Sequence, residues 1–339
     1  MNFKVDAYLE ESCVIGGILE KEGPIGNYLD YCHDFNNKSF EDSEIEMLDY
    51  TITLLLKKIN CSITDFDIAI SGELSNQLAT TSYTYRNYQI PLIGIYSACS
   101  SIALGIGLAS ILLSRDEIKR ILVTTSCNNQ SAERQFRNPN EYGGEKEPTQ
   151  TSTSTIGAAI SIVKEKKPIH ISSFTIGKVI DVGFKDSLDF GRAMVPGALE
   201  TLFEHFEKNN KTPNDYDLIL TGDLSKYGSD IVKIELEKVF GIVNNYNDCG
   251  LLIYDIDKQN VLAGGSGPGT SAAVLLSYVK KKMLEGKLKR VLLCATGVLM
   301  NPTMVFQKNS LPSIAHCIEL EVIKWYTYMH LFLVGLSVH

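Results

Sequence analysis

The sequence predicts an α/β fold built from two similar halves, because three segments of the first half recur in the same order in the second. The similarity is closest between DFDIAISGELS (Asp65–Ser75) and DYDLILTGDLS (Asp215–Ser225). The other two pairs are Tyr96–Leu113 with Gly264–Val279, and Lys119–Asn129 with Lys289–Leu299. An ordered repeat of this kind indicates a duplicated unit. Parallel strands of such units lie buried between helix layers, so equivalent strand ends are expected to meet at a shared pocket.

Helices are predicted from apolar residues at helical spacing and from charge order. Asp42–Lys58 carries acids early and lysines late, which suits the helix dipole. Ile102–Leu113 is apolar with several small residues, a composition suited to close packing in the centre of the fold. The remaining predicted helices are Ser75–Thr84, Ala132–Phe136, Met194–Lys208, Ser229–Phe240 and Ser271–Gly286.

Short apolar runs between turns predict the strands. In the first half these are Asp67–Ser71, Ile90–Tyr96, Arg120–Thr125, Gly157–Val163 and Ile169–Val182. In the second half they are Asp217–Thr221, Leu251–Tyr254, Arg290–Ala295 and Ser313–Glu321. The long polar segment Ser126–Thr155 separates two of the strands, and loops of this length inside a domain are usually functional.

Composition excludes several classes of protein. The chain has 339 residues, 44% of them apolar, so it can bury a large core. A net charge of −8 without a basic stripe argues against nucleic-acid binding. The eight cysteines form no CxxC pair, so a structural zinc site is not expected. The first residues do not resemble a secretory signal, so synthesis in the cytoplasm is expected.

We therefore expect an N-terminal half at 1–185, a C-terminal half at 186–320 and an atypical apolar tail at 321–339. No linker separates the halves, which predicts one rigid body. The tail is too short to span a bilayer, which takes about 20 apolar residues. It either packs against the body or anchors at an interface, and it could also be a frameshifted end.

Cys99 is the first candidate for chemistry. It lies in SACSS, between a strand and a long apolar helix. A cysteine at a helix N-terminus is exposed to the positive end of the dipole, which stabilises a thiolate or a bound anion. The strand–turn–helix context is shared with nucleophile elbows, although a small residue chosen only for packing would also fit.

A duplicated α/β unit with ACS at the start of the central helix resembles the thiolase superfamily, whose condensing enzymes use such a cysteine as an acyl-carrying nucleophile. Longer motifs make the resemblance more specific: SAERQFR (Ser131–Arg137), EYGG (Glu141–Gly144), YDLILTGDLS (Tyr216–Ser225), NDCGLLIYD (Asn247–Asp255), AGGSGPGTSA (Ala263–Ala272) and PSIAH (Pro312–His316). Through these motifs the chain is similar to the stage V sporulation protein AD family.

The resemblance implies a thiolase-like fold, a layered αβαβα sandwich of two pseudo-symmetric βαβαβ-type halves. It also implies a subunit of the spore SpoVA apparatus that binds dipicolinic acid, alone or with Ca²⁺, for uptake in sporulation and release in germination. No cofactor is expected. The implied partners are the SpoVA membrane subunits and a second copy of the chain, and the implied location is peripheral, at the spore inner membrane.

The sequence departs from the condensing enzymes at their proton-handling residues. Those enzymes place a histidine at the end of the second-half strand and an asparagine or second histidine before the small-residue helix. Here the first position falls at Gly222–Asp223 and the second at Gly267–Gly269. Each missing oxyanion donor typically costs about 10²–10³ in rate. His316 is the only histidine near a family motif, and we expect it to be structural.

The remaining candidate ligand contacts come from three segments. Gly265 and Ser266 precede a helix, where backbone N–H groups could form an anion nest facing Cys99 or simply allow close packing. Asp223 would meet a dianion through a hydrogen bond or through Ca²⁺, or else would cap the following helix. Ser225 belongs to the same motif. Glu73, the first-half counterpart of Asp223, is expected to be structural.

Arg134 and Arg137 are three residues apart, so they share one face of a helix. Two guanidinium groups could hold a dicarboxylate. Ion pairing with Glu133 and Glu141, which would pin the loop, is the preferred alternative.

Three functions remain open. The first is a non-catalytic subunit that binds dipicolinic acid. The second is an acyltransferase or condensing enzyme using Cys99, with Asp223 as its base. The third is a scaffold that inherited the pocket without a ligand.

Overall fold

The structure is a computed structural model that describes residues 1–34, 39–136 and 144–323. The tail from residue 324 onward and Arg137 therefore lie outside the described residues. The strands are β1 (Asn2–Gly16), β2 (Tyr31–Cys32), β3 (Ile68–Gly72), β4 (Leu92–Gly94), β5 (Arg120–Cys127), β6 (Ser152–Thr153), β7 (Ile156–Val163), β8 (Ile169–Ile176), β9 (Leu218–Thr221), β10 (Tyr246–Asp248), β11 (Gly265–Ser266), β12 (Arg290–Val298) and β13 (Ser313–Val322).

The helices include all seven predicted segments, with shifted ends, and three short ones that were not predicted. They are α1 (Ile18–Lys21), α2 (Phe40–Ile59), α3 (Ala79–Tyr85), α4 (Ser101–Leu112), α5 (Asn129–Phe136), α6 (Phe190–Asn209), α7 (Ser225–Phe240), α8 (Cys249–Ile253), α9 (Pro268–Ala273), α10 (Lys280–Leu284) and α11 (Pro302–Phe306). A π-helical stretch, η7 (Val274–Val279), joins α9 to α10 without a break.

The order of the strands reveals the duplication. Within the described residues, the large sheet runs β10-β9-β12-β13-β8-β1-β7-β5-β3-β4, with β2 paired to β1. Each strand of one half has a counterpart in the other: the pairs are β1 and β8, β3 and β9, β4 and β10, β5 and β12, and β7 and β13. When every strand is replaced by its counterpart, the order of the sheet is the original order read backwards. The directions match as well, because β3 is parallel to both β4 and β5, and β9 is parallel to both β10 and β12.

The repeat extends to individual hydrogen bonds. Asp67 Oδ2 accepts from the backbone N–H groups of Lys119 and Arg120 at 2.7 and 3.0 Å. Asp217 Oδ2 accepts from those of Lys289 and Arg290 at 2.6 and 2.8 Å. In each half an aspartate thus ties the start of one strand to its parallel neighbour, which fixes the same register twice.

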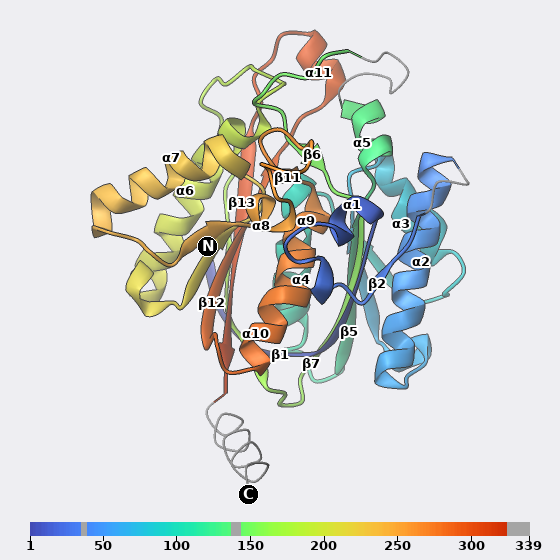
Figure 1. Cartoon of the computed structure of the whole chain (residues 1–339). Coiled ribbons are helices and arrows are strands. Elements are labelled where there is room, and N and C mark those ends of the chain that lie inside the picture. The colour runs from blue at the N-terminus through green and yellow to red at the C-terminus, as the bar shows by residue number, and fades with distance from the viewer. Residues whose placement is uncertain (35–38, 137–143, 324–339) are drawn as a thin grey trace, which may run out of the picture.

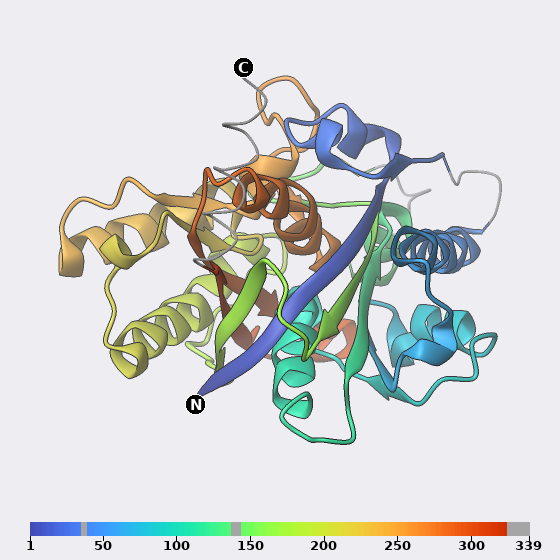
Figure 2. The ribbon, with the colours of Figure 1, turned by 90° about the horizontal axis from the view of Figure 1, so that it is seen from below.

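The layers are visible in Figure 1: α6 and α7 cover one outer face, α2 and α3 cover the other, and α4 and α10 lie between the two halves of the sheet. β1 crosses beneath these central helices when the molecule is viewed from below (Figure 2). The thiolase-like αβαβα arrangement predicted from the sequence is therefore confirmed.

The central helices pack through small residues, as predicted. A side chain on Gly107 of α4 would overlap the ring of Phe174, whose nearest atom is 2.3 Å from the position of the added carbon. Gly105 approaches Val123 of β5 in the same way, at 2.7 Å. These contacts hold α4 against the sheet and so fix the position of its N-terminus, which follows Cys99.

Two sequence-based expectations about elements differ from the structure, and one long strand was not predicted. Leu251–Tyr254 was expected to be a strand, but Cys249–Ile253 forms helix α8, because Asp248 caps it by accepting from Gly250 N at 2.8 Å. Helix α7 begins at Ser225 and not near Ser229. Strand β1 was not predicted, although its fifteen residues lie in the middle of the sheet.

The boundary between the halves follows from the correspondence between their strands. β8 was expected to close the first half, but it takes the place of β1 in the second half and pairs with both β1 and β13. We propose that the halves meet in the turn before Ile169, and not at residue 185. Among the described helices, none combines the length and the apolar character that crossing a bilayer requires.

Candidate functional site

The turn that carries Cys99 is tightly held. Ala98 adopts a positive φ of 47°, a conformation that side chains other than glycine rarely take. The Ser101 hydroxyl donates to Ala98 O at 2.7 Å, and the Ser100 hydroxyl donates to Ser97 O at 2.7 Å. Gly297 of β12 passes so close that an added side-chain carbon would lie 2.7 Å from Ser97 O. The predicted elbow is therefore present, with a strained residue directly before the thiol.

The surroundings of Cys99 oppose ionisation. The side chain is buried, with its sulfur 4.0 Å from Ser266 Oγ. Burial and, next, the nearby charge of Asp223 raise the pKa of the Cys99 thiol well above its usual value. A thiolate is the nucleophilic form of cysteine, so this environment lowers the reactivity that a helix N-terminus would otherwise confer.

The glycine-rich turn binds the carboxyl group of Asp223, whose pKa is raised by burial. Asp223 Oδ2 accepts from Ser266 Oγ at 2.9 Å and from Gly267 N at 3.0 Å, and its Oδ1 accepts from Thr296 Oγ1 at 2.8 Å. Of the backbone N–H groups expected to form an anion nest, that of Gly267 binds the chain's own carboxyl group. These donors are then unavailable to the oxyanion of a thioester intermediate.

The suggested capping role of Asp223 is wrong, because Asp248 fulfils it. Asp248 accepts from Leu224 N and Ser225 N, at 3.0 and 2.9 Å, where α7 begins. Sequence reasoning did not single out Asp248, although it lies within the motif Asn247–Asp255. The signal that could have found it is an acid directly before a short Cys-Gly turn, the usual position of a helix N-cap.

Glu73, the counterpart of Asp223 in the repeat, stays within its own half. It accepts from Ser75 Oγ at 2.7 Å and from Thr81 N at 3.3 Å, so it shapes the turn into α3. The two equivalent acids therefore differ in reach: Glu73 bonds locally, whereas Asp223 bridges three segments of the second half.

His316 lies near the elbow but does not hydrogen-bond the thiol. Its Nδ1 accepts from Gly177 N at 3.3 Å, so its Nε2 carries the proton and donates to Ser97 Oγ at 2.9 Å. Burial lowers the pKa of His316 to about 4, which keeps the ring neutral near pH 7. Within the described part of the chain, no histidine hydrogen-bonds Cys99 Sγ.

The cavity at Cys99 is small. It measures about 20 Å³, and its walls are mainly apolar. Its lining includes Cys99, Tyr96, Thr153, Ser266, Val298 and Met300. A space of this size holds about one water molecule. A planar dicarboxylate would enter only if the surrounding loops moved.

The other predicted contacts do not line this cavity. Gly265 packs against Ile253 and Tyr254, and its carbonyl accepts from Ser225 Oγ at 2.8 Å. Arg134 faces away, pairing with Glu41 and stacking over Phe40, and not with the expected Glu133. Arg137 and Glu141 lie outside the described residues. The structure thus brings Cys99, Ser266 and Asp223 together but separates them from Ser225 and Arg134.

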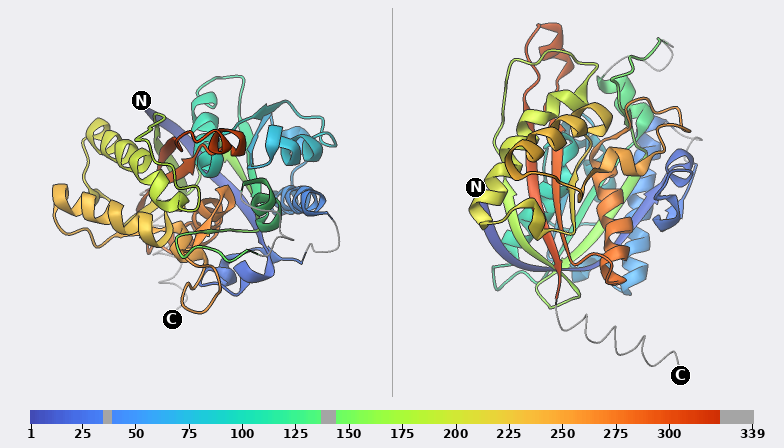
Figure 3. Two further views of the ribbon diagram at one scale, coloured as in Figure 1. Left: turned by 90° about the horizontal axis from the view of Figure 1, so that it is seen from above. Right: turned by 60° about the vertical axis from the view of Figure 1, so that its left-hand side comes forward.

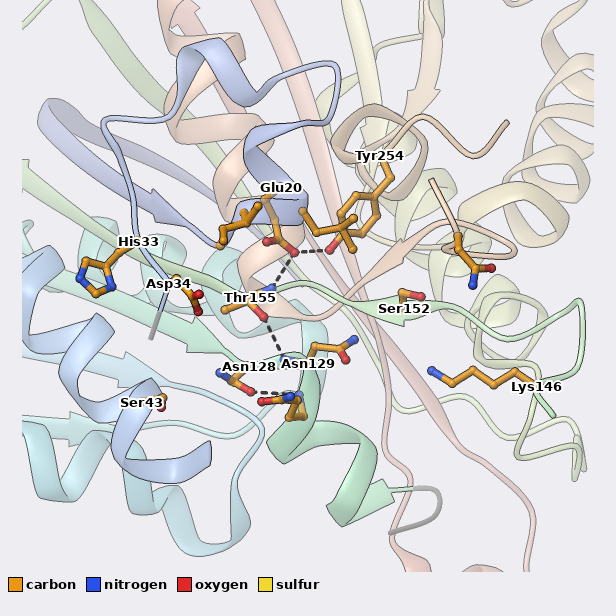
Figure 4. A pocket seen from close by; sticks show the side chains of 15 residues that line it. Glu20, His33, Asp34, Ser43, Asn128, Asn129, Lys146, Ser152, Thr155 and Tyr254 are labelled. Carbon is orange, nitrogen blue, oxygen red and sulfur yellow. Dashed lines mark hydrogen bonds between the residues drawn. The ribbon is translucent and has the colours of Figure 1, made fainter. Parts of the chain in front are cut away.

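A second, larger pocket was missed by sequence reasoning. It has a volume of about 320 Å³ and is lined mainly by polar residues of α1, the start of α5 and the segment Ser152–Thr155 (Figure 4). Its members come from eight separate stretches of sequence, so no motif marks it. The described residues contain no group of three or more His, Cys, Asp or Glu side chains placed to hold a metal ion.

Both sites lie toward the end of the molecule where α5, β6 and β11 are found, which Figure 3 shows from above. The parallel strands β3, β5, β9 and β12 direct their carboxyl ends toward this face. This position agrees with the expectation that equivalent strand ends meet at a shared region.

Solved structures share this fold across the chain. A 3-oxoacyl-(acyl-carrier-protein) synthase III from Aquifex aeolicus is 11% identical, with a TM-score of 0.53 over 94% of this chain and 99% of its own. Cerulenin-bound OleA from Xanthomonas campestris is 13% identical, with a TM-score of 0.61 over 95% and 100%. At these identities the likeness concerns the fold alone.

Sequence relationships are more specific. The family model described as stage V sporulation protein AD (SpoVAD) matches residues 1–321. Stage V sporulation protein AD of Bacillus subtilis (strain 168) is 43% identical over 323 residues, covering 94% of this chain and 95% of the relative. This chain, with its thiolase-like fold and its carboxylate-occupied elbow, belongs to the SpoVAD family of sporulation proteins.

Proposed function

We propose that this protein is a non-catalytic binding subunit for dipicolinic acid in the spore SpoVA apparatus. The observation that carries the non-catalytic part is the contact between the Cys99 elbow and the Asp223 carboxylate. Membership of the SpoVAD family supports the role in sporulation.

The chemistry of thioester condensation argues against a working catalyst here. An acyl-carrying cysteine needs a thiolate, a proton acceptor and donors for the oxyanion. In this chain burial and Asp223 disfavour the thiolate, His316 donates to Ser97, and the donors at Ser266 and Gly267 serve Asp223. These contacts support a non-catalytic role.

Calorimetry with the full chain tests the proposal. Dipicolinate titrated into the protein, with and without Ca²⁺, is expected to release or absorb heat with a stoichiometry near one per chain. A folded sample that gives no signal in either condition would contradict the proposed function. The comparison between conditions also shows whether the free acid or its calcium chelate is the preferred ligand.

An acyltransferase that uses Cys99 is the second candidate, favoured by the intact elbow and by fold neighbours that include a 3-oxoacyl synthase. Incubation with acyl-CoA followed by intact-mass measurement separates the two functions. An acyl adduct that disappears in Cys99→Ser would establish the enzyme. No adduct is expected, because the thiol is held in its protonated form.

The third candidate, a scaffold without a ligand, predicts a normal spore phenotype when Cys99 or Asp223 is replaced without loss of folding. Dipicolinate binding by the pure protein would exclude it. The proposed location, peripheral at the spore inner membrane with SpoVA membrane subunits as partners, is tested by asking whether the full chain co-sediments with membranes that contain those subunits and not with membranes that lack them.

A homodimer is also proposed, and the open edge of the sheet at β4 supports it. All three residues of β4 are exposed, and Leu92 and Ile93 are 37% exposed apolar side chains. An unpaired apolar edge strand is a template for pairing with a second chain. Ile93→Lys is expected to convert a dimer to a monomer in size-exclusion chromatography with light scattering; an unchanged mass would place the interface elsewhere.

A further inference from the structure

A groove lies at the end of the molecule opposite the Cys99 cavity. It has a volume of about 520 Å³ and is formed mainly by the start of β1 and the end of α4. Helix α4 begins next to Cys99 and has twelve residues, which span about 18 Å at 1.5 Å per residue. The end of α4 is therefore far from Cys99, and we call the space beside it the basal groove.

The exposed lining of the basal groove is mainly apolar. Phe3, Val5 and Ile111 line it, and each packs against the core while remaining partly exposed. Leu113, which also lines it, is 1% exposed. Removing apolar surface from water contributes about 25 cal/mol per Å². An apolar segment that covered these side chains would therefore stabilise the fold.

The chain itself carries such a segment close to the groove. Sixteen residues, 324–339, follow Ile323, and ten of them are apolar while none is acidic. Ile323 N donates to Pro168 O at 3.1 Å, at the end of the turn between β7 and β8. Lys164, at the start of the same turn, lines the groove. This turn and the end of β13 both lie at the foot of the molecule in Figure 1.

The length of the tail is sufficient to reach the groove. The four residues from Lys164 to Pro168 span at most about 14 Å, so Ile323 lies within about 20 Å of Lys164. Sixteen residues span about 24 Å as a helix and about 50 Å when extended, so either conformation covers this distance. A short covalent connection also holds the tail near the groove at an effective concentration that is roughly millimolar.

The charged groups of the groove favour an apolar occupant over a small ion. Lys164 Nζ donates to Asp116 at 3.0 Å, and Asp6 accepts from the Tyr8 hydroxyl at 2.8 Å. Both charges are thus engaged with neighbours of the same chain. The family match ends at residue 321, so the tail also lies beyond the segment that the family model describes.

We propose that the tail 324–339 packs into the basal groove of its own chain, with apolar side chains against Phe3, Val5 and Ile111. The tail then covers the end of the central layer, where α4 meets β1. This inference does not depend on the proposed ligand or on its site.

The test is fluorescence of the full chain with one tryptophan in the tail. Trp325 is the only tryptophan, so Trp325→Phe combined with Phe332→Trp moves the probe to the middle of the tail. In the folded protein its emission is expected at shorter wavelength than in the chain unfolded in urea. Acrylamide is expected to quench this emission at least twofold less efficiently than in the unfolded chain.

A variant of the groove links this signal to the proposed contact. Ile111→Lys, made in the same background, places a charge on the wall at a helical position that is already partly exposed. Emission and quenching are then expected to approach those of the unfolded chain. Ile234→Lys makes the same change at a 52% exposed position of α7, and it is the matched control that is expected to leave the signal unchanged.

Three outcomes would overturn the inference. The first is a tryptophan that is as accessible in the folded protein as in urea, and the second is an Ile111→Lys variant that folds and keeps the original quenching. The third is emission that shifts only with protein concentration, which indicates a second chain, or only with added phosphatidylglycerol vesicles, which indicates a membrane anchor. Circular dichroism shows whether Ile111→Lys folds. If it does not, Ile111→Thr is expected to raise quenching by a smaller amount, and unchanged quenching there contradicts the inference.

Discussion

The two cavities on either side of β6 differ in volume and in the groups that line them. The Cys99 cavity has the elbow of a condensing enzyme, but it is nearly closed and its polar donors are bound to Asp223. The polar pocket is about 320 Å³ and is lined mainly by polar residues. The elbow, which is a local sequence motif, therefore marks the smaller cavity, whereas only the folded chain reveals the larger one.

Replacing Asp223 is expected to have the largest effect, because Asp223 organises the surroundings of Cys99. Asp223→Ala leaves the Ser266, Gly267 and Thr296 donors without their acceptor in a buried site. The free energy of unfolding is expected to fall by about 3–5 kcal/mol in urea titrations.

Asp223→Asn is the matched control, since it keeps the volume and one acceptor oxygen. Its loss is expected to be smaller, and removal of the charge should lower the pKa of Cys99, measured as faster alkylation near pH 8. A drop of less than 1 kcal/mol in Asp223→Ala would show that the turn does not depend on this carboxylate.

Enlarging the Cys99 cavity tests whether dipicolinate binds there. Met300→Ala shortens a buried side chain on its wall, and the unfolding free energy should fall by about 2–3 kcal/mol. Dipicolinate affinity is expected to stay within twofold of the wild type by calorimetry. Tighter binding in this variant would mean that the ligand sits at Cys99 and that the natural cavity opens to admit it.

Buried acids on the Cys99 side are expected to make stability depend on pH. Burial, together with the charge of Asp223, raises the pKa of Asp248 to about 7. The native state then holds a proton that the unfolded chain, with an ordinary aspartate pKa near 4, releases. The stabilisation of the native state by this proton is complete below about pH 4, and it is lost as the pH rises toward 7.

The measurement compares unfolding of the wild type and Asp248→Asn at several pH values. The difference between them is expected to change by about 4 kcal/mol across this window, since each pKa unit between the native and unfolded values contributes about 1.4 kcal/mol. Glu319 gives the opposite sign elsewhere in the fold: burial would raise its pKa, but hydrogen bonds from His205, Lys211 and Tyr216 lower it to about 2. A flat difference between wild type and Asp248→Asn would show that Asp248 is ionised throughout.

The smallest effect is expected at Arg134, which belongs to neither cavity. Its pair with Glu41 is exposed on both sides, and such pairs are worth about 0.5 kcal/mol or less. Arg134→Ala should therefore unfold almost like the wild type and bind dipicolinate equally well. A large loss of affinity would restore the idea of an arginine clamp on the dicarboxylate.

Much of the architecture could be predicted because its signals are local. Helical spacing marked α2, α4 and α6 to within a few residues at most ends, and the repeated DFDIAIS and DYDLILT segments marked β3 and β9. α8 was missed because its apolar run of five residues is equally compatible with a strand, and only the Asp248 cap decides between them.

What the sequence alone determined was the duplication and the elbow at Cys99, since each repeated segment and the elbow itself are short local motifs. What only the tertiary structure decided was the partner of each side chain. Asp223 meets Thr296 and Ser266, and Asn128 faces a wall contributed by distant segments, because folding of the two halves brings their loops to one face. Contacts between residues so far apart leave no periodic pattern, and so they appear only once the sheet is assembled.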